Sequence, residues 1–296
     1  MQQALSSEAS ALAVRRAVRR RWLTHTGLII GSTILVLIVA IALLAPLLAP
    51  HDPYEQDLLA RTIPPFWMEG GSWEHPLGTD HLGRDYLSRL LYGARISLVI
   101  GIVTALVSGV IGTALGVTAG YFGGRVDTVI TFIITARLAM PVILVALAVV
   151  ALFGSSFTVV ITVLGLLLWD RYALVVRSAT QQIRDLDFVM AARVQGASRW
   201  QIIRDEILPN IAAPLTVVAT LEIAQAIVLE AALSFLGLGV PPPLPSWGLM
   251  LAEGKAYILF DPWLITIPGA LLFSLVLAIN LVGDGLRDVS APEARN

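Results

Sequence analysis

The stretch DFVMAARVQGASRWQIIRDEILPN, residues 187–210, is the most informative segment of the sequence for the fold. It is polar and basic, yet it lies between two long apolar runs. Its first part is rich in helix-favouring residues, and Gly196 suits the left-handed conformation that closes a helix. Ser198 followed by Gln201 fits a capping box, so a second helix should begin there. The pattern predicts two short helices joined by a glycine turn at a membrane surface.

The second of these helices has one apolar face. Its apolar residues recur every three to four positions, which places them on a single stripe: Trp200, Ile203, Ile207 and Leu208. A short amphipathic helix of this kind is suited to docking into a groove of another protein. We therefore predict that residues 187–210 bind a partner protein.

The composition is that of a membrane protein. The chain of 296 residues is 56% hydrophobic and 14% charged, with a mean hydropathy of +0.79. Because a soluble domain carries about 25% charged residues, these charges are too few to cover a surface in water. A net charge of −1 argues against a nucleic-acid partner. The lack of cysteine excludes disulfides, thiolate metal sites and cysteine nucleophiles.

Six apolar runs are long enough to cross a bilayer core, which takes about 20 helical residues. The first run is longer than the core of a secretory signal, about 7–15 residues, and predicts an uncleaved helix. The runs cover residues 27–48, 96–121, 127–153, 157–176, 211–236 and 263–282. We expect an all-α integral membrane protein with one transmembrane domain, residues 27–290. A polar arm at 1–26 and a tail at 291–296 flank it.

The basic residues orient these spans, because Lys and Arg concentrate in cytoplasmic loops. Six crossings place both termini on one side, and most arginines fall on that side, including the cluster at residues 15–21. The basic residues on the other side are Arg61, Arg84, Arg89, Arg95 and Lys255. The distribution predicts cytoplasmic termini, a cytoplasmic segment 187–210 and a periplasmic loop 50–94.

Charged residues inside spans are costly and need a partner or water. Arg137 in the third span and Glu222 in the fifth share a depth near the bilayer centre. We expect them to pair or to face one aqueous cavity or pathway within the membrane; the alternative is a buried structural pair. Gln225 lies about 60° from Glu222 around the helix, and Glu230 lies nearer the outside. These two are predicted either to line an outer vestibule or to hydrogen-bond to neighbours.

Small residues and prolines shape the spans. Small residues recur every four positions in the second span and let helices approach closely: Ser108, Gly112, Gly116 and Gly120. This row predicts packing within the chain; the alternative is a contact that slides when the helices move. Pro141 and Pro268 each remove a helical hydrogen bond and predict kinks.

No catalytic or metal-binding motif is found in the sequence. No P-loop surrounds the only lysine, Lys255, so the sequence has no nucleotide site of that kind, and no Ser-His-Asp arrangement is present. The loop 50–94 does gather histidines and carboxylates: His51, His75, His81, Asp52, Glu74, Asp80 and Asp85. Their spacing matches no compact metal motif, and we predict no cofactor and no metal in this chain.

Four stretches resemble one protein family. The residues A-A-R-x-x-G-A-S and I-L-P-N within 187–210 resemble the coupling (EAA) loop of ABC-importer permeases, with Met190 in place of that loop's usual glutamate. Residues 75–98, 230–251 and 280–288 resemble the dipeptide/oligopeptide/nickel class of these permeases, and the second of its two permease subunits. In the third span, Thr135 stands near the position of an aspartate that is frequent in the family.

The resemblance implies a type I ABC-importer permease fold with one extra N-terminal helix in a bacterial inner membrane. It implies a transport subunit that carries short peptides by alternating access, rather than an enzyme. The implied partners are a homologous second permease, two subunits that bind ATP and Mg, a periplasmic or lipid-anchored substrate-binding protein, and membrane lipid. The implied coupling residues are Ala191, Ala192, Arg193, Gly196, Ala197, Ser198, Ile207, Leu208 and Pro209.

Two alternatives remain open from the sequence. The same machinery could import nickel, glutathione or another small solute, because the family's specificity lies largely in the external binding protein. An ion-coupled secondary transporter acting alone is a second alternative, since Arg137 and Glu222 lie where such proteins build their ion sites.

Overall fold

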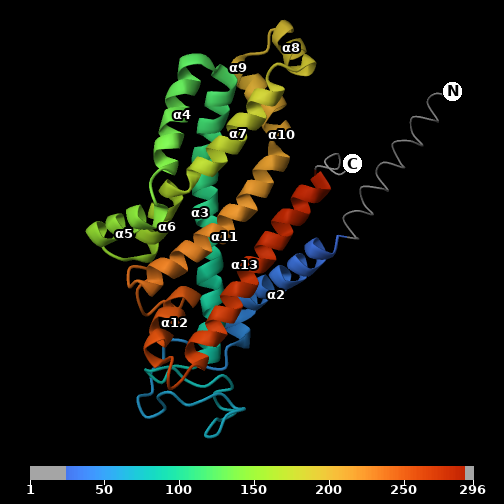
Figure 1. The fold of residues 1–296 in the computed structure, drawn as a ribbon. Coiled ribbons are helices and arrows are strands. Elements are labelled where there is room, and N and C mark those ends of the chain that lie inside the picture. Colours follow the sequence, from blue (N-terminus) through green and yellow to red (C-terminus); the bar gives the residue numbers. More distant parts are fainter. Residues whose placement is uncertain (1–24, 291–296) are drawn as a thin grey trace, which may run out of the picture.

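The computed structural model describes residues 25–290, which form helices and loops with one isolated β-bridge between Thr79 and Asp85. Most of the predicted arm 1–26 and the whole tail 291–296 lie outside the described residues. Five helices are long and apolar enough to cross a membrane, and a sixth crossing results when one bent pair counts as a single span. The predicted all-α membrane architecture is confirmed (Figure 1).

Two spans distant in sequence lie side by side. Helix α2 (Thr26–Leu48) packs along α13 (Trp263–Ser290) (Figure 1). A Cβ on Gly31 would lie 2.8 Å from the carbonyl oxygen of Ala278, so a glycine is needed for this approach. The imidazole Nε2 of His25 lies 3.1 Å from a carboxylate oxygen of Asp288. The beginning of α2 and the end of α13 therefore meet at the same end of the molecule.

Helix α3 (Tyr86–Phe122) is the longest element, with 37 residues. It begins ten residues before the predicted span, so the predicted loop 50–94 is wrong over its last part. Asp85 caps the helix by accepting a hydrogen bond from the Ser88 amide at 2.7 Å. The charged residue Arg89 in the first turns suggested a loop, but its side chain is fully buried against carboxylates.

The glycine row of α3 packs against α7 (Trp169–Ile183). A Cβ on Gly116 would lie 2.7 Å from the carbonyl oxygen of Ala173, and one on Gly120 would lie 2.7 Å from that of Arg177. The two backbones are in direct contact because no side chain separates them. The predicted packing role of the small residues is confirmed.

The third predicted span is broken rather than kinked. Helices α4 (Gly124–Leu138) and α5 (Val142–Phe153) meet at an angle of 82°, and Pro141 is the residue before α5. Proline lacks the amide hydrogen that would continue α4. The fourth predicted span, 157–176, continues further: α6 (Phe157–Leu167) and α7 together form one candidate crossing, Phe157–Ile183.

The remaining helices form the two ends of the molecule. One end is formed by the short helices α8 (Asp187–Val194), α9 (Arg199–Gln201) and α10 (Leu208–Asn210). Helix α11 (Ala212–Phe235) leads from there to the opposite end, which contains α12 (Trp247–Gly254) and a 3₁₀ turn η2 (Lys255–Tyr257). Residues 49–85 cover that second end (Figure 1). We name the two ends the α8 end and the α12 end. Helix α12 was not predicted, because its eight residues are too few for a span.

A buried charge cluster ties the loop to α3 and α12 at the α12 end. Arg84 Nε donates to Asp80 at 2.7 Å and its terminal nitrogen donates to Glu253 at 3.1 Å. Arg89 bridges the same two carboxylates, with 2.7 Å to Glu253. Each of the two guanidinium groups is paired with both carboxylates, and this charge balance offsets the cost of burial, although Nε and one terminal nitrogen of Arg89 have no hydrogen-bond partner among the described residues.

Candidate functional site

The first half of the predicted coupling loop forms as the sequence indicates. Helix α8 (Asp187–Val194) is closed by Gln195 and Gly196, and the φ of Gly196 is +86°. The Gly196 amide donates to the Arg193 carbonyl and the Ala197 amide donates to the Ala192 carbonyl, both at 3.1 Å. These two bonds are a Schellman motif, which closes a helix through a left-handed residue. The predicted glycine turn is confirmed.

The second half keeps the predicted cap but changes helix type. Ser198 and Gln201 form both bonds of a capping box, at 2.8 and 3.3 Å. Helix α9 (Arg199–Gln201) then passes into a π-helix η1 (Ile202–Ile207) and α10 (Leu208–Asn210). A π-helix has hydrogen bonds between residues five apart, whereas the sequence prediction assumed the 3.6-residue repeat of an α-helix. The π-helical segment was therefore not predicted.

The predicted apolar stripe does not face outward as one surface. Trp200 is 68% exposed, whereas Ile203 is nearly buried and Ile207 is fully buried. The buried residues pack with Val117 of α3 and Val176 of α7. Ile207 therefore anchors the loop to the spans and is not exposed to a partner, and its predicted part in coupling stays a prediction.

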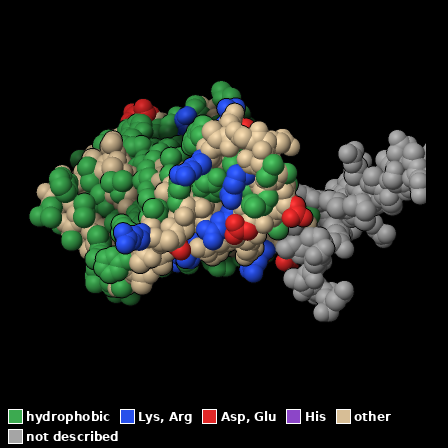
Figure 2. Space-filling view, turned by 90° about the horizontal axis from the view of Figure 1, so that it is seen from above, with side chains coloured by type: hydrophobic (Ala, Val, Ile, Leu, Met, Phe, Trp, Pro, Cys, Tyr) green, Lys and Arg blue, Asp and Glu red, His purple; other side chains and the backbone are tan. Residues whose placement is uncertain are grey.

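The exposed surface of the α8 end combines apolar and basic side chains. Only Val189 of α8 is buried, while Val194 is 87% exposed. Figure 2, which looks onto this end, shows basic side chains gathered between hydrophobic ones. The predicted coupling residues divide into exposed ones (Ala191, Arg193, Gly196, Ser198, Pro209) and half-buried ones (Ala192, Ala197, Leu208). Phe188 and Val194 were not predicted, although apolar residues opposite Val189 were a usable signal.

A continuous apolar contact leads from this surface into the membrane region. Trp200 and Ile203 line a groove of about 570 Å³ whose other walls are α3, α11 and Tyr172 of α7. Tyr172 is fully buried, and its hydroxyl donates to the Ala105 carbonyl of α3 at 3.1 Å. The loop therefore shares this groove with three membrane helices, α3, α7 and α11. A displacement of the loop would change its contacts with all three.

The predicted pairing of Arg137 with Glu222 is wrong. The Glu222 carboxylate is fully buried in α11 and its partner is Arg171 of α7, at 3.5 Å. Arg137 instead donates to the carbonyl oxygens of Leu167 and Met140. Pairing between α7 and α11 was not foreseen, because residue counts along a span give depth and not the direction of a side chain.

Glu230 has a structural role, which decides between its two predicted alternatives. Its side chain is fully buried, and it accepts hydrogen bonds from the hydroxyls of Ser234 at 2.7 Å and Ser246 at 3.0 Å. Ser246 in turn caps α12 by accepting from the Leu249 amide. Glu230 therefore fixes α12 onto α11 and lines no vestibule. Gln225 is half-buried.

The structure thus combines membrane-length helices, a loop at one end that is closed by a Schellman motif and a capping box, and an ion pair between two spans. Residues 112–296 match the family described as binding-protein-dependent transport system inner membrane component, and residues 15–65 match the N-terminal TM domain of oligopeptide transport permease C. The chain belongs to this family of inner membrane transport components.

Individual relatives agree with this assignment. The chain is 41% identical to the dipeptide transport system permease protein DppC of Haemophilus influenzae over 92% of each chain. It is 42% identical to DppC of Escherichia coli strain K12 and to the di/tripeptide transport system permease protein DppC of Pseudomonas aeruginosa, over 92% of this chain and 90% of each relative. The predicted resemblance to ABC-importer permeases is confirmed, and an ion-coupled transporter is not favoured.

Among solved structures, inward facing conformations of the MetNI methionine ABC transporter share the fold. The TM-score is 0.57 at 22% identity, over 69% of this chain and 95% of that chain. At this identity the likeness concerns the fold alone. The predicted type I ABC-importer permease fold is thereby confirmed, and the chain is a multi-pass membrane transport subunit.

Proposed function

We propose that this chain forms one half of the pathway through which an ATP-driven importer carries short peptides. The observation that carries the proposal is the loop 187–210, which is locked by a Schellman motif and a capping box and is held on α3 and α7 by a buried cluster. A rigid loop with exposed apolar and basic side chains is suited to receive force from a partner. Identity of 41–42% to dipeptide and di/tripeptide permeases supports peptides as the cargo.

The proposed assembly contains a homologous second permease as heterodimer partner, two ATP-binding subunits at the α8 end, and a periplasmic or lipid-anchored substrate-binding protein at the α12 end. ATP and Mg are held by the ATP-binding subunits. Exposed arginines at the α8 end, such as Arg193 and Arg199, support a cytoplasmic position for it. The contact of His25 with Asp288 supports termini that share one side.

The proposed mechanism is alternating access. Closure of the ATP-binding subunits moves the loop, and the buried residues around Ile207 pass that movement to α3 and α7. Helix α7 carries Arg171 along the face of Glu222 in α11, so its movement changes the charge pair at mid-depth. A partner shifts such an equilibrium only through contacts that differ between the two states, and those contacts would be made at the loop.

A pull-down of the full-length chain from native membranes in mild detergent tests this function. We expect two ATP-binding subunits and a second permease to co-purify, with ATPase activity stimulated by the binding protein loaded with a dipeptide or tripeptide. Stimulation by a nickel-loaded or glutathione-loaded binding protein, and not by peptides, would contradict the peptide cargo. Recovery of the chain alone, still active in transport, would contradict the coupling role of the loop.

A further inference from the structure

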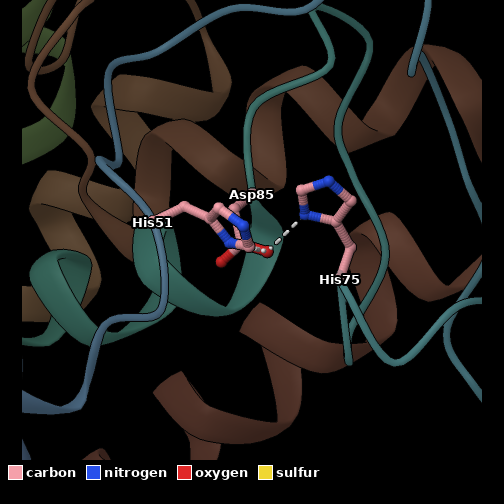
Figure 3. A group of neighbouring side chains, drawn as sticks. All are labelled: His51, His75 and Asp85. Carbon is pink, nitrogen blue, oxygen red and sulfur yellow. Dashed lines mark hydrogen bonds and ion pairs between the residues drawn. The ribbon is translucent and has the colours of Figure 1, made fainter.

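Three polar side chains that are far apart in the sequence converge at the α12 end. His51 follows the end of α2, His75 comes from the middle of the loop, and Asp85 caps α3. Figure 3 shows both imidazole rings next to the Asp85 carboxylate. The Nδ1 atom of His75 lies 2.9 Å from Asp85 Oδ1, and the Nδ1 atom of His51 lies 3.6 Å from the same oxygen.

These three atoms have the spacing of metal ligands. All three lie within 4.8 Å of one another. Ligands of a tetrahedral zinc ion, with bonds of about 2.0–2.1 Å, stand about 3.3–3.5 Å apart. The two distances from the histidines to Asp85, 2.9 and 3.6 Å, lie on either side of that value. Two imidazoles and one carboxylate form a donor set that suits divalent ions such as Zn²⁺, Co²⁺ and Ni²⁺.

The local hydrogen bonds orient two of the ligand atoms toward each other and leave the third without a partner. Asp85 uses Oδ2 to accept the Ser88 amide at 2.7 Å, which fixes the carboxylate and leaves Oδ1 directed at the histidines. The His51 amide donates to the Ser88 hydroxyl at 3.1 Å, which fixes the backbone of that residue. The His51 Nδ1 atom is itself buried and has no hydrogen-bond partner among the described residues. Fixed outer contacts of this type orient metal ligands.

A neighbouring cluster with similar residues lacks these properties. Asp80, His81 and Glu253 also lie within ligand distance of one another. Their carboxylates, however, are already neutralised by the guanidinium groups of Arg84 and Arg89, which would repel a cation. No arginine or lysine is within ion-pair distance of Asp85 in residues 25–290. The two clusters therefore differ in charge, although both contain histidine and carboxylate.

We propose that His51, His75 and Asp85 bind a resident divalent transition-metal ion, with Zn²⁺ as the reference ion and water completing its coordination. The ion replaces the proton shared by His75 and Asp85 and gives the unpartnered His51 Nδ1 a ligand role. It joins the exit of α2, the loop and the start of α3, and so stiffens the surface on which an external protein would land. The site is independent of the transported cargo and of the proposed coupling to ATP.

Zinc titration of the full-length chain in detergent, stripped beforehand with a chelator, tests the site. We expect one Zn²⁺ per chain, a higher thermal unfolding midpoint with Zn²⁺, and slower proteolysis within residues 52–74. His51→Ala and His75→Ala should each weaken zinc affinity at least tenfold. His81→Ala is the matched control, because it removes a histidine of the same loop from the neighbouring cluster, and it should leave zinc affinity unchanged.

Three results would overturn the proposal. Equal zinc affinity in the unsubstituted chain, His51→Ala and His75→Ala would show that these residues are not ligands, and a loss in His81→Ala alone would assign the zinc to the other cluster. His75→Gln guards against misfolding, because glutamine still donates to Asp85 but is a poor zinc ligand. X-ray absorption of the zinc-loaded unsubstituted chain gives an independent readout: two imidazoles are expected, and a shell without imidazole would refute the site.

Discussion

The Glu222 carboxylate of α11 and the Arg171 guanidinium of α7 lie 3.5 Å apart, and the two side chains differ sharply in exposure. Glu222 is fully buried, whereas the Arg171 side chain is 57% exposed. An exposed guanidinium at mid-span needs water or a partner surface, since a charge facing lipid is costly. The pair thus connects the packed interior of the chain with an exposed face of α7.

Arg171→Ala should impair transport more than stability. The substitution removes the partner of Glu222 Oε1, while Oε2 already has none among the described residues, and we expect it to cost about 1–3 kcal/mol in unfolding free energy. Arg171→Lys keeps the charge and serves as control; it should retain most transport. Peptide uptake and thermal unfolding in detergent, measured on both variants, check this. Unchanged uptake in Arg171→Ala would remove the pair from the pathway.

Gly116→Val should destabilise the contact between α3 and α7. A Cβ at Gly116 would lie 2.7 Å from a backbone oxygen, and overpacking of this kind costs about 1–3 kcal/mol. Gly269→Ala in α13 is the matched control, because its nearest neighbour would be a Leu251 methyl at 3.5 Å. We expect a lower thermal midpoint for the first variant only; equal midpoints would contradict backbone contact between the helices.

Gly196→Val should uncouple the loop without unfolding the protein. No atom lies within 4 Å of a Cβ at this position, so the cost is conformational: about 1 kcal/mol or more for a left-handed β-branched residue. Gly196→Asn is the control, since asparagine tolerates the left-handed region. Peptide-stimulated ATPase activity of the assembled importer should fall in the valine variant and persist in the asparagine variant. Wild-type coupling in Gly196→Val would refute the role of the turn.

Trp200→Ala should weaken binding of the ATP-binding subunits and leave the fold intact. The indole is 68% exposed at the α8 end, and exposed aromatic residues frequently dominate binding at interfaces. Trp73→Ala provides the comparison, because that side chain is 74% exposed at the opposite end. The yield of co-purified ATP-binding subunits is the readout, and an equal yield from both variants would place the docking surface elsewhere.

The charge cluster around Asp80 should make stability depend on pH. Burial by itself would raise the pKa of Asp80, but the Arg89 and Arg84 guanidiniums hold that pKa below its ordinary value of 3.8. A lowered folded-state pKa means that the carboxylate contributes stability above pH 3.8, and that this contribution is lost as pH falls through the lower, folded-state value.

Asp80→Asn therefore should cost about 3–5 kcal/mol at neutral pH, because it leaves buried arginines short of a counter-charge. The difference in unfolding free energy between wild type and variant should shrink below pH 3.8. Glu55→Gln, on an exposed residue of the same loop, should show little effect at any pH. A difference that stays constant with pH would contradict the role of the ionised carboxylate.

The sequence by itself determined the elements that depend on local chemistry. Apolar runs must be buried in lipid as helices, so five spans could be located, and the glycine turn at Gly196 and the cap at Ser198 follow from backbone conformation and hydrogen bonding over a few residues. The packing of the glycine row on α3 was also predictable, because small residues at this spacing allow two helix backbones in a membrane to approach closely.

Only the tertiary structure decided which distant groups meet. Arg171, and not Arg137, reaches Glu222, and His51 joins His75 and Asp85, because the rotation of each helix and the path of the loop are set by packing across the whole chain. The π-helix and the burial of Ile207 have the same origin. Spacing along a chain fixes depth and periodicity, whereas contact between segments is settled by the close packing of every other side chain.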